Sequence, residues 1–341
     1  MSTAVYAPSR LESRVRQLLP WLLLAVLALL PAAGLTANII RLFFITFVWV
    51  TTSLGWNLLG GLTGQVSFGF AVFYGLGAYT AALMIDRGVS PYISFVAAGL
   101  IPAVSSVLIG LPTFRLRGPY FAIATIGVSE ATRVIMNNLA ITGGASGFRI
   151  VEHRPFHQVE HYYTALALAT LAVAASFLIM HSKFGMGLRA IKQDEDAAAD
   201  IGVNPYANKL AIHAVAAAFT GMAGGVFARY AAFIYPQGVF AFQTSVYILL
   251  MPVIGGIGTI WGAVLGGVVF GIVEEQLVAN FPQIHLLLYG ILLILIILAE
   301  PDGLAGLAGK LSRRLRTPRR KNGVHSGSRK TDEVLRRAGG G

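Results

Sequence analysis

Apolar residues in this chain are gathered into long runs, which short polar segments separate. Ten runs can be delimited, at residues 18–34, 38–59, 68–85, 91–112, 119–138, 162–180, 208–230, 242–256, 259–277 and 284–299. Most of them approach the length of about 20 residues that a helix needs to cross the hydrocarbon core of a bilayer. The run at 242–256 is short and interrupted by glycine. The pattern predicts an all-α polytopic membrane protein with about ten transmembrane helices, some of them short or broken.

The composition supports this prediction and excludes several kinds of chemistry. Hydrophobic residues make up 55% of the 341 residues and charged residues only 12%, against about 25% charged residues in an ordinary soluble domain. Because cysteine is absent, disulfide and thiolate chemistry are excluded. No Walker motif or H-E-x-x-H motif is present. The chain is therefore not expected to be an enzyme or to hydrolyse nucleotide itself.

The distribution of charge predicts how the chain is oriented. The net charge is +11, and 11 of the 26 Lys and Arg residues follow Leu304. With ten crossings, the basic N-terminus, the polar segment 183–209 and the basic tail share one side, which the positive-inside rule makes cytoplasmic. The basic tail lacks interleaved aromatic residues, so we expect it to meet membrane lipid and no nucleic acid. Residues 1–33 also fit a signal peptide, but an uncleaved first helix is preferred because it keeps the number of crossings even.

This topology divides the chain into three regions. Residues 1–17 form a cytoplasmic N-terminal segment and residues 18–300 the transmembrane domain. Residues 301–341 form a basic tail that we expect to be cytoplasmic and disordered. Within the transmembrane domain, 183–209 is a cytoplasmic loop and 139–161 an extracytoplasmic loop.

The extracytoplasmic loop carries three histidines. His153, His157 and His161 follow one another at i, i+4 and i+8, which would place them on one face of a helix. Pro155 interrupts the segment. A solvated loop is therefore favoured over a metal site, and no metal is expected.

Two glycine clusters lie between apolar runs. Gly60 to Gly69 lies between the second run and the third, and Gly255 to Thr259 lies between the eighth and ninth, followed by Gly262, Gly266 and Gly267. Glycine at such spacings lets helix backbones approach closely, and this packing role is favoured. The sharper alternative is that broken helices line a solute path. The candidate pathway residues in these clusters are Gly61, Gly64, Gln65, Ser67, Gly255 and Gly256.

Ionisable residues within the apolar runs are few. Glu130 and Arg133 stand at i, i+3 on one face of the fifth run. Such residues are costly in a membrane and are normally paired or turned inward. A structural ion pair is favoured, and a position beside the path of a zwitterionic solute is the alternative.

Other polar residues near the ends of the runs receive a simpler interpretation. His213 and Arg229 lie near opposite ends of the seventh run, and we expect them to snorkel or to cap the helix. Glu274 and Glu275 close the ninth run and are expected at the level of the lipid headgroups.

The polar segment between the sixth and seventh runs is the most informative stretch of the chain. It reads KFGMGLRAIKQDEDAAADIGVNPYANK over residues 183–209 and favours a short amphipathic helix that ends at Gly202, with a turn at Asn204-Pro205. Ala197, Ala198 and Ala199 would give this helix a smooth surface. A small helix with charged edges suits docking into a groove on another protein, whereas a solvated loop is the plain alternative.

Several stretches together resemble a known family. Asp196-Ala197-Ala198 followed by Gly202 resembles the E-A-A-x-x-x-G coupling motif of ABC importer permeases, with Asp where the motif has Glu. More specifically, the chain resembles the branched-chain amino acid ABC transporter permeases, M-type subunit. The similar stretches are NLLGGLTGQVSFG (57–69), LRGPYFAIAT (116–125), Thr142-Gly143-Gly144 with Gly147, LRAIKQDEDAAADIG (188–202) and 255–267.

The resemblance implies a non-catalytic subunit of an ATP-driven importer in the bacterial inner membrane. It implies a second homologous permease subunit, two cytoplasmic ABC ATPase subunits and an extracytoplasmic substrate-binding protein that meets the 139–161 loop. ATP would be used by the partner subunits, and no cofactor is expected on this chain. The ATPase-coupling residues implied are Leu188, Arg189, Asp194, Glu195, Asp196, Ala197, Ala198 and Gly202.

The substrate stays open at this point. Branched-chain amino acids are favoured, but similar permeases carry urea, short amides or other amino acids, and a separate binding protein largely selects the solute. Two other classes of protein are the alternatives. An ion-coupled secondary transporter has no use for an ATPase-docking helix, and a membrane-bound enzyme would need clustered acidic or histidine residues at one membrane face.

Overall fold

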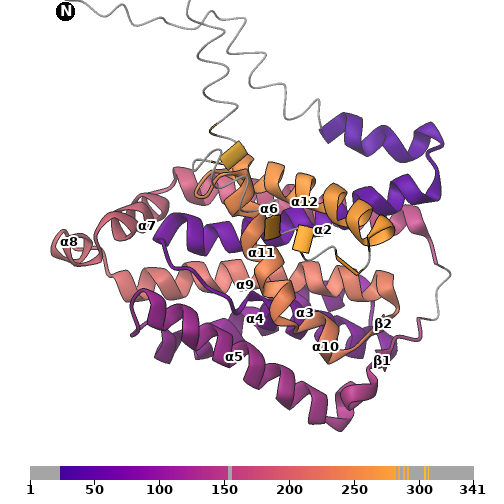
Figure 1. Cartoon of the computed structure of the whole chain (residues 1–341), viewed down its shortest axis with the longest axis horizontal. Helices are drawn as coiled ribbons and strands as arrows, with labels where there is room; N and C mark the ends of the chain where they lie inside the picture. Colours follow the sequence, from indigo (N-terminus) through magenta and orange to yellow (C-terminus); the bar gives the residue numbers. More distant parts are fainter. Residues whose placement is uncertain are drawn as a thin grey trace, which may run out of the picture.

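A computed structural model describes residues 24–152, 156–281, 283–284, 287–288, 290–291, 303–304 and 306. These residues are mostly helical (Figure 1). The long helices are α2 (Ala37–Trp56), α3 (Phe70–Asp86), α4 (Pro91–Thr113), α5 (Pro119–Asn138), α6 (Gln158–His181), α9 (Pro205–Ala231), α11 (Phe242–Gly255) and α12 (Ile260–Asn280). Shorter helices are η1 (Leu30–Ala33), η2 (Asn57–Gly61), η3 (Ala140–Thr142), η4 (Gly144–Ser146), α7 (Lys183–Gln193), α8 (Glu195–Asp200) and α10 (Pro236–Val239).

The predicted crossings agree with these helices in most places. Among the described residues, six helical stretches are long and apolar enough to cross a membrane, at Ala37–Gly61, Pro91–Thr113, Gln158–His181, Pro205–Ala231, Pro236–Gly255 and Ile260–Leu277. Leu24–Ala33 and Phe70–Asp86 are shorter apolar helices. Helix α5 has the predicted bounds but is the least apolar of the long helices, because Glu130 and Arg133 lie within it.

Some predictions fall outside the described part of the chain. The N-terminal segment 1–17, most of the tenth run at 284–299 and nearly all of the tail 301–341 lie outside the described residues. Their expected structure and sidedness therefore stay predictions.

Helix α9 lies at the centre of the bundle, where it packs against α3, α4 and α2. The contact with α3 is unusually close because both helices present glycine. A Cβ atom added at Gly77 would lie 2.0 Å from the carbonyl oxygen of Gly221, and one added at Gly224 would lie 2.0 Å from that of Tyr74. Small residues allow such backbone approach in membranes, where packing drives helix association.

The bundle has two distinct ends in Figure 1. At one end, α7 and α8 project beyond the long helices. At the other end, β1 (Phe148–Arg149) pairs antiparallel with β2 (Phe233–Ile234), in the register Phe148 with Ile234 and Arg149 with Phe233. This short pairing was not predicted. It joins the loop before α6 to the connection after α9.

Arg229 holds the same end of the bundle together. Its side chain is only 2% exposed and binds two carboxylates, Glu152 and Glu160, each at 2.8 Å. The expectation that Arg229 snorkels towards water is therefore wrong. The expectation for His213 is also wrong: it is buried, with its ring 5.0 Å from that of Phe73 and 5.2 Å from that of Phe114. A run of apolar residues gives no sign that aromatic rings or carboxylates from other helices will enclose these side chains.

Candidate functional site

The projecting segment consists of two helices and not one. Ser182 starts α7, its hydroxyl accepting the N–H of Gly185 at 3.1 Å. At Asp194 the backbone becomes extended, with φ −158° and ψ 118°. The Asp194 carboxylate accepts the N–H groups of Asp196 and Ala197, at 2.9 and 3.0 Å, and so starts α8. The prediction of a single helix over this segment is wrong because aspartate satisfies the free N–H groups of a new first turn. Gly202, with φ +86°, ends α8 as expected.

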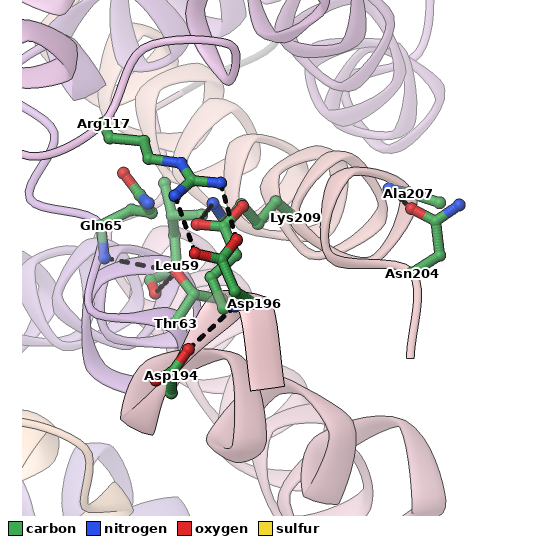
Figure 2. Close-up of polar contacts among 10 residues, drawn as sticks. Leu59, Thr63, Gln65, Arg117, Asp194, Asp196, Asn204, Ala207 and Lys209 are labelled. Atoms are coloured by element: carbon green, nitrogen blue, oxygen red, sulfur yellow. Dashed lines mark hydrogen bonds and ion pairs between the residues drawn. The ribbon is translucent and has the colours of Figure 1, made fainter. Parts of the chain in front are cut away.

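Two ion pairs fix α8 to the body of the chain (Figure 2). Arg117, from the connection between α4 and α5, donates to both carboxylate oxygens of Asp196, at 3.2 and 2.9 Å. Lys209, near the start of α9 and only 1% exposed, donates to Glu195 at 2.5 Å. The hydrogen bond and the charge of Arg117 lower the pKa of Asp196 below its ordinary value. Helix α8 is therefore held against two different parts of the bundle.

The two faces of the α7–α8 segment (residues 183–202) differ in character. Leu188, Ile191 and Ala198 are buried against the chain itself, at 0%, 4% and 2% exposure. Met186 and Ile201 point away from it, at 59% and 75% exposure. The expectation that Ala198 belongs to the docking surface is thus wrong, whereas the alanines on either side of it are exposed. The outward face combines these apolar side chains with exposed Arg189 and acidic residues.

The two glycine clusters meet beneath α7. Helix α2 passes into η2, a π-helical turn, and Asn57 in this turn contacts the second cluster. Its amide donates to the carbonyl of Thr259 at 3.1 Å and accepts the N–H of Gly258 at 2.8 Å. Lys192, in the last turn of α7, donates to the carbonyl oxygen of Gly61 at 2.9 Å. We call Asn57, Gly61, Lys192, Gly258 and Thr259 the glycine junction. π-Helical turns occur often at functional sites.

Glycine is required in the second cluster for steric reasons. A Cβ atom at Gly255 would lie 1.8 Å from the carbonyl oxygen of Gly262. Gly256 has φ +123°, a backbone conformation that other residues rarely adopt. Both expected pathway glycines therefore lie where α11 ends and the chain turns towards α12.

The remaining pathway candidates of the first cluster differ in exposure. Gly64 is exposed with φ +75°, and Gln65 is half-buried. Ser67 is 1% exposed, and its hydroxyl accepts the N–H of Gly69 at 3.2 Å. The Ser67 hydroxyl thus serves the turn that leads into α3, in keeping with the favoured structural role, and a position beside a solute path stays a prediction.

Glu130 and Arg133 form the expected ion pair on α5, with the Arg133 Nε donating to Glu130 at 3.0 Å. The pair lies on a face that the chain leaves uncovered. The Glu130 side chain is 53% exposed and that of Arg133 is 27% exposed. Ile123 on the same helix is 65% exposed. The pair is therefore not turned into the bundle of this chain.

A cavity of about 460 Å³ opens near the β1–β2 end of the bundle. Arg41 of α2 forms an ion pair with Glu275 of α12 at its rim. Deeper in, the indole N–H of Trp49 donates to Glu274 at 2.8 Å. Glu274 and Glu275 both line this cavity, and their expected position at the level of the lipid headgroups stays a prediction.

The histidines of the 139–161 loop do not share one environment. His161 lies in the first turn of α6 and is 3% exposed, with its ring 4.9 Å from that of Phe156 and 5.5 Å from that of Tyr230. The solvated loop expected here is thus wrong for His161. His153 lies outside the described residues. Within the part of the chain that the structure describes, no group of three or more His, Cys, Asp or Glu residues could hold a metal ion.

Sequence reasoning missed Asn57, Lys192, Arg41 and Trp49. Asn57 did carry a signal, as an amide inside an otherwise apolar run. Lys192 and Arg41 carried none, since Lys192 is one of several charged residues in the polar segment 183–209 and Arg41 is an ordinary basic residue near the start of an apolar run. Their partners lie 131 and 234 residues away along the chain.

Comparison with known proteins relates the chain to one family. The family described as "Branched-chain amino acid transport system / permease component" matches residues 38–297. The LivM permease protein of the high-affinity branched-chain amino acid transport system of Salmonella typhimurium is 30% identical, over 86% of this chain and 76% of the relative. LivM of Escherichia coli is 29% identical over the same shares. LivH of Escherichia coli is 26% identical, over 74% of this chain and 90% of the relative.

No solved structure matches the chain. The family match covers every long helix described above except the first residue of α2. It therefore includes the α7–α8 segment, the glycine junction and the cavity. On this match and on the similarity to LivM, the chain belongs to the family of branched-chain amino acid transport permeases and is a multi-pass, non-catalytic permease component.

Proposed function

We propose that this permease component imports branched-chain amino acids within an ATP-driven transporter. Its partners would be a second homologous permease, two cytoplasmic ABC ATPase subunits and an extracytoplasmic binding protein. The relatives LivM and LivH are permease proteins of high-affinity branched-chain amino acid transport systems, which supports both the substrate and the second permease. The α7–α8 segment is the observation that carries the proposal for the ATPases.

The α7–α8 segment has the properties of a docking element. It projects at one end of the bundle (Figure 1), and its side chains Met186 and Ile201 are 59% and 75% exposed. Exposed large apolar side chains on a projecting segment are a feature of interaction sites. The ion pairs of Asp196 and Glu195 hold α8 in a fixed orientation, so little ordering is required when a partner binds.

The glycine junction supports a route from the docked ATPase to the transmembrane helices. Lys192 belongs to α7 and binds the carbonyl of Gly61, where η2 ends. A displacement of α7 would therefore act directly on the point where the two glycine clusters meet. Rigid-body shifts of this kind, passed on through a few polar contacts, are a common means of switching between conformations.

The exposed face of α5 suits the second permease. An ion pair facing hydrocarbon is costly, and charged groups in membrane helices normally face protein or water. Glu130 and Arg133 lie on the uncovered face of α5. We therefore place the second permease, or the path between the two permeases, against this face.

The proposed orientation puts the α7–α8 end in the cytoplasm and the β1–β2 end outside. The positive-inside rule supports this, because the basic flanks of the apolar runs lie on the side of the 183–209 loop. The binding protein would then meet the end at which β1 and β2 pair.

The docking proposal is tested by replacing Ile201 with Glu. Burying an isoleucine side chain contributes about 1.5–3 kcal/mol, so Ile201→Glu should weaken capture of the ATPase subunits by about 10-fold or more. The measurement is a titration of the purified chain, in lipid nanodiscs, with ABC ATPase subunits of its own organism. Ile141→Glu is the matched control, because Ile141 is 51% exposed at the β1–β2 end. Equal ATPase affinity of the two folded variants would contradict the docking proposal.

A further inference from the structure

The cavity near the β1–β2 end combines opposite charges with aromatic walls. Its rim carries the guanidinium of Arg41 and the carboxylate of Glu275, which pair with each other. Its interior carries the carboxylate of Glu274, bound by the indole of Trp49 at 2.8 Å. A volume of about 460 Å³ lies within the range typical of small-ligand sites. If the Arg41–Glu275 ion pair had only a structural role, it would not require a cavity of this volume beside it.

The walls are largely apolar and include six aromatic side chains. The ring of Trp49 lies 6.3 Å from that of Tyr74 in a stacked arrangement and 6.5 Å from that of Tyr247 edge-on. Ile45 and Phe227 add apolar surface. Aromatic faces attract organic cations, and apolar walls accept an aliphatic side chain. The cavity therefore offers the features that an ammonium group and an aliphatic chain require.

The depth of the cavity suits a site within the bilayer. Trp49 is the thirteenth residue of α2, so it lies about 18 Å along that helix from Ala37. This is more than half the length of a helix that spans the hydrocarbon core. An ionisable group such as Glu274 at this depth marks a functional site by default.

A broken helix borders the cavity. The apolar stretch Pro236–Gly255 consists of α10 and α11, and the chain leaves the helical conformation at Ala241 between them. Gly238 and Val239 of α10 and Thr244, in the first turn of α11, all line the cavity. Discontinuous helices whose N-termini face anionic groups form the substrate sites of many transporters. The start of α11 would thus favour a carboxylate in the cavity.

We propose that this cavity is a binding site for a zwitterionic α-amino acid with an aliphatic side chain. The substrate carboxylate binds Arg41 and the first turn of α11, the ammonium group binds Glu274, and the side chain lies against Trp49 and Tyr74. A guanidinium offers five donors, so pairing with Glu275 leaves Arg41 able to bind a second carboxylate. This inference rests on the proposed function for the class of substrate, and it adds a site within this one chain.

The absence of cysteine makes the site testable by substrate protection. Thr244→Cys introduces a single thiol on the cavity wall of the full-length chain. In lipid nanodiscs, L-leucine should slow its reaction with a charged methanethiosulfonate reagent. Ser146→Cys, exposed in η4 and outside the cavity lining, is the matched control and should react at the same rate with and without leucine.

Substrate analogues test the charges without any further substitution. 4-Methylpentanoate lacks the ammonium group and 3-methylbutylamine lacks the carboxylate. Each should require at least about tenfold more ligand than leucine for half-protection, as expected for loss of a hydrogen bond to a charged group. Glu274→Gln keeps an acceptor for the Trp49 indole but removes the charge, and it should shift half-protection by leucine by about tenfold or more.

Each outcome bears on one proposal. Absence of protection by leucine, while the assembled transporter still takes up leucine with ATP, would overturn the cavity site and leave the proposed function intact. Equal protection by all three ligands would also overturn it, because only an apolar contact would remain. Protection by leucine that depends on both charged groups and on Glu274 would support the site. A lack of ATP-driven leucine uptake by the unmodified transporter would instead contradict the proposed function.

Discussion

Replacing Lys192 with Met should uncouple ATP hydrolysis from transport without undocking the ATPases. The substitution keeps most of the aliphatic stem but removes the ammonium group that binds the carbonyl of Gly61 at 2.9 Å. It leaves the outward face of Met186 and Ile201 unchanged. The two functions of the α7–α8 segment, docking and transmission, can therefore be separated.

The size of the effect follows from the contact. A hydrogen bond to a charged group contributes about 1.5–3 kcal/mol. Because Lys192 is exposed and solvent screens its charge, we take the lower value, about 1.5 kcal/mol. The coupling free energy between two sites cannot exceed the free energy of the contacts that carry it. If this contact carries the coupling, its loss should lower the coupling about tenfold.

The assay is the ratio of amino acid transported to ATP hydrolysed in proteoliposomes that hold the complete transporter. This ratio should fall about tenfold in Lys192→Met, while ATPase capture stays at the level of the unmodified chain. Lys183→Met is the matched control, because Lys183 is exposed at the opposite end of α7. An unchanged ratio in Lys192→Met, with the control also unchanged, would refute the reasoning that the glycine junction transmits the motion of α7.

Two further predictions concern the stability of the bundle. Arg229→Met should lower the free energy of unfolding by about 3–5 kcal/mol, because it leaves two carboxylates at a half-buried site without their common partner. Thermal unfolding in detergent measures this, and exposed Arg87→Met should change little. Gly77→Ala should cost about 1–3 kcal/mol or more, since the new Cβ would lie 2.0 Å from the carbonyl of Gly221. Gly127→Ala meets no atom within 4 Å and should be neutral or stabilising, so similar losses in both alanine variants would contradict the close packing of α3 and α9.

The long helices were predictable because an apolar run has few alternatives in a membrane. Every span needs its backbone hydrogen bonds satisfied internally, so length and hydropathy locate it. The run at 119–138 coincides with α5, whose first residue is Pro119. Proline is favoured at the start of a helix, because its missing N–H would have no partner there.

The details of the α7–α8 segment were less predictable. From the local sequence, Asp194 can either continue a helix or start a new one. Its side chain starts a new helix here because other contacts hold α8 in place. Lys209 and Arg117 provide those contacts through Glu195 and Asp196. No local pattern reveals partners that belong to other helices.

The cavity was not predictable for a related reason. Sequence distance from the end of an apolar run placed Glu274 near the membrane surface. The structure pairs it with Trp49, 225 residues earlier in the chain. The depth of a side chain depends on the tilt and packing of its helix, which hydropathy does not determine.

Helix α9 connects the α7–α8 end of the bundle with the β1–β2 end. It is a continuous helix of 27 residues, with Lys209 near its start and Arg229 near its end. The separation of 20 residues between them along the helix corresponds to about 30 Å. Near its start, Lys209 binds Glu195 of α8, and near its end, Arg229 binds Glu152 in the loop before α6. The middle of α9 packs closely against α3. Because α9 is one continuous helix, a tilt at one of its ends also displaces the other end. A displacement of the segment that carries Glu152 should therefore move α8, and a displacement of α8 should move that segment.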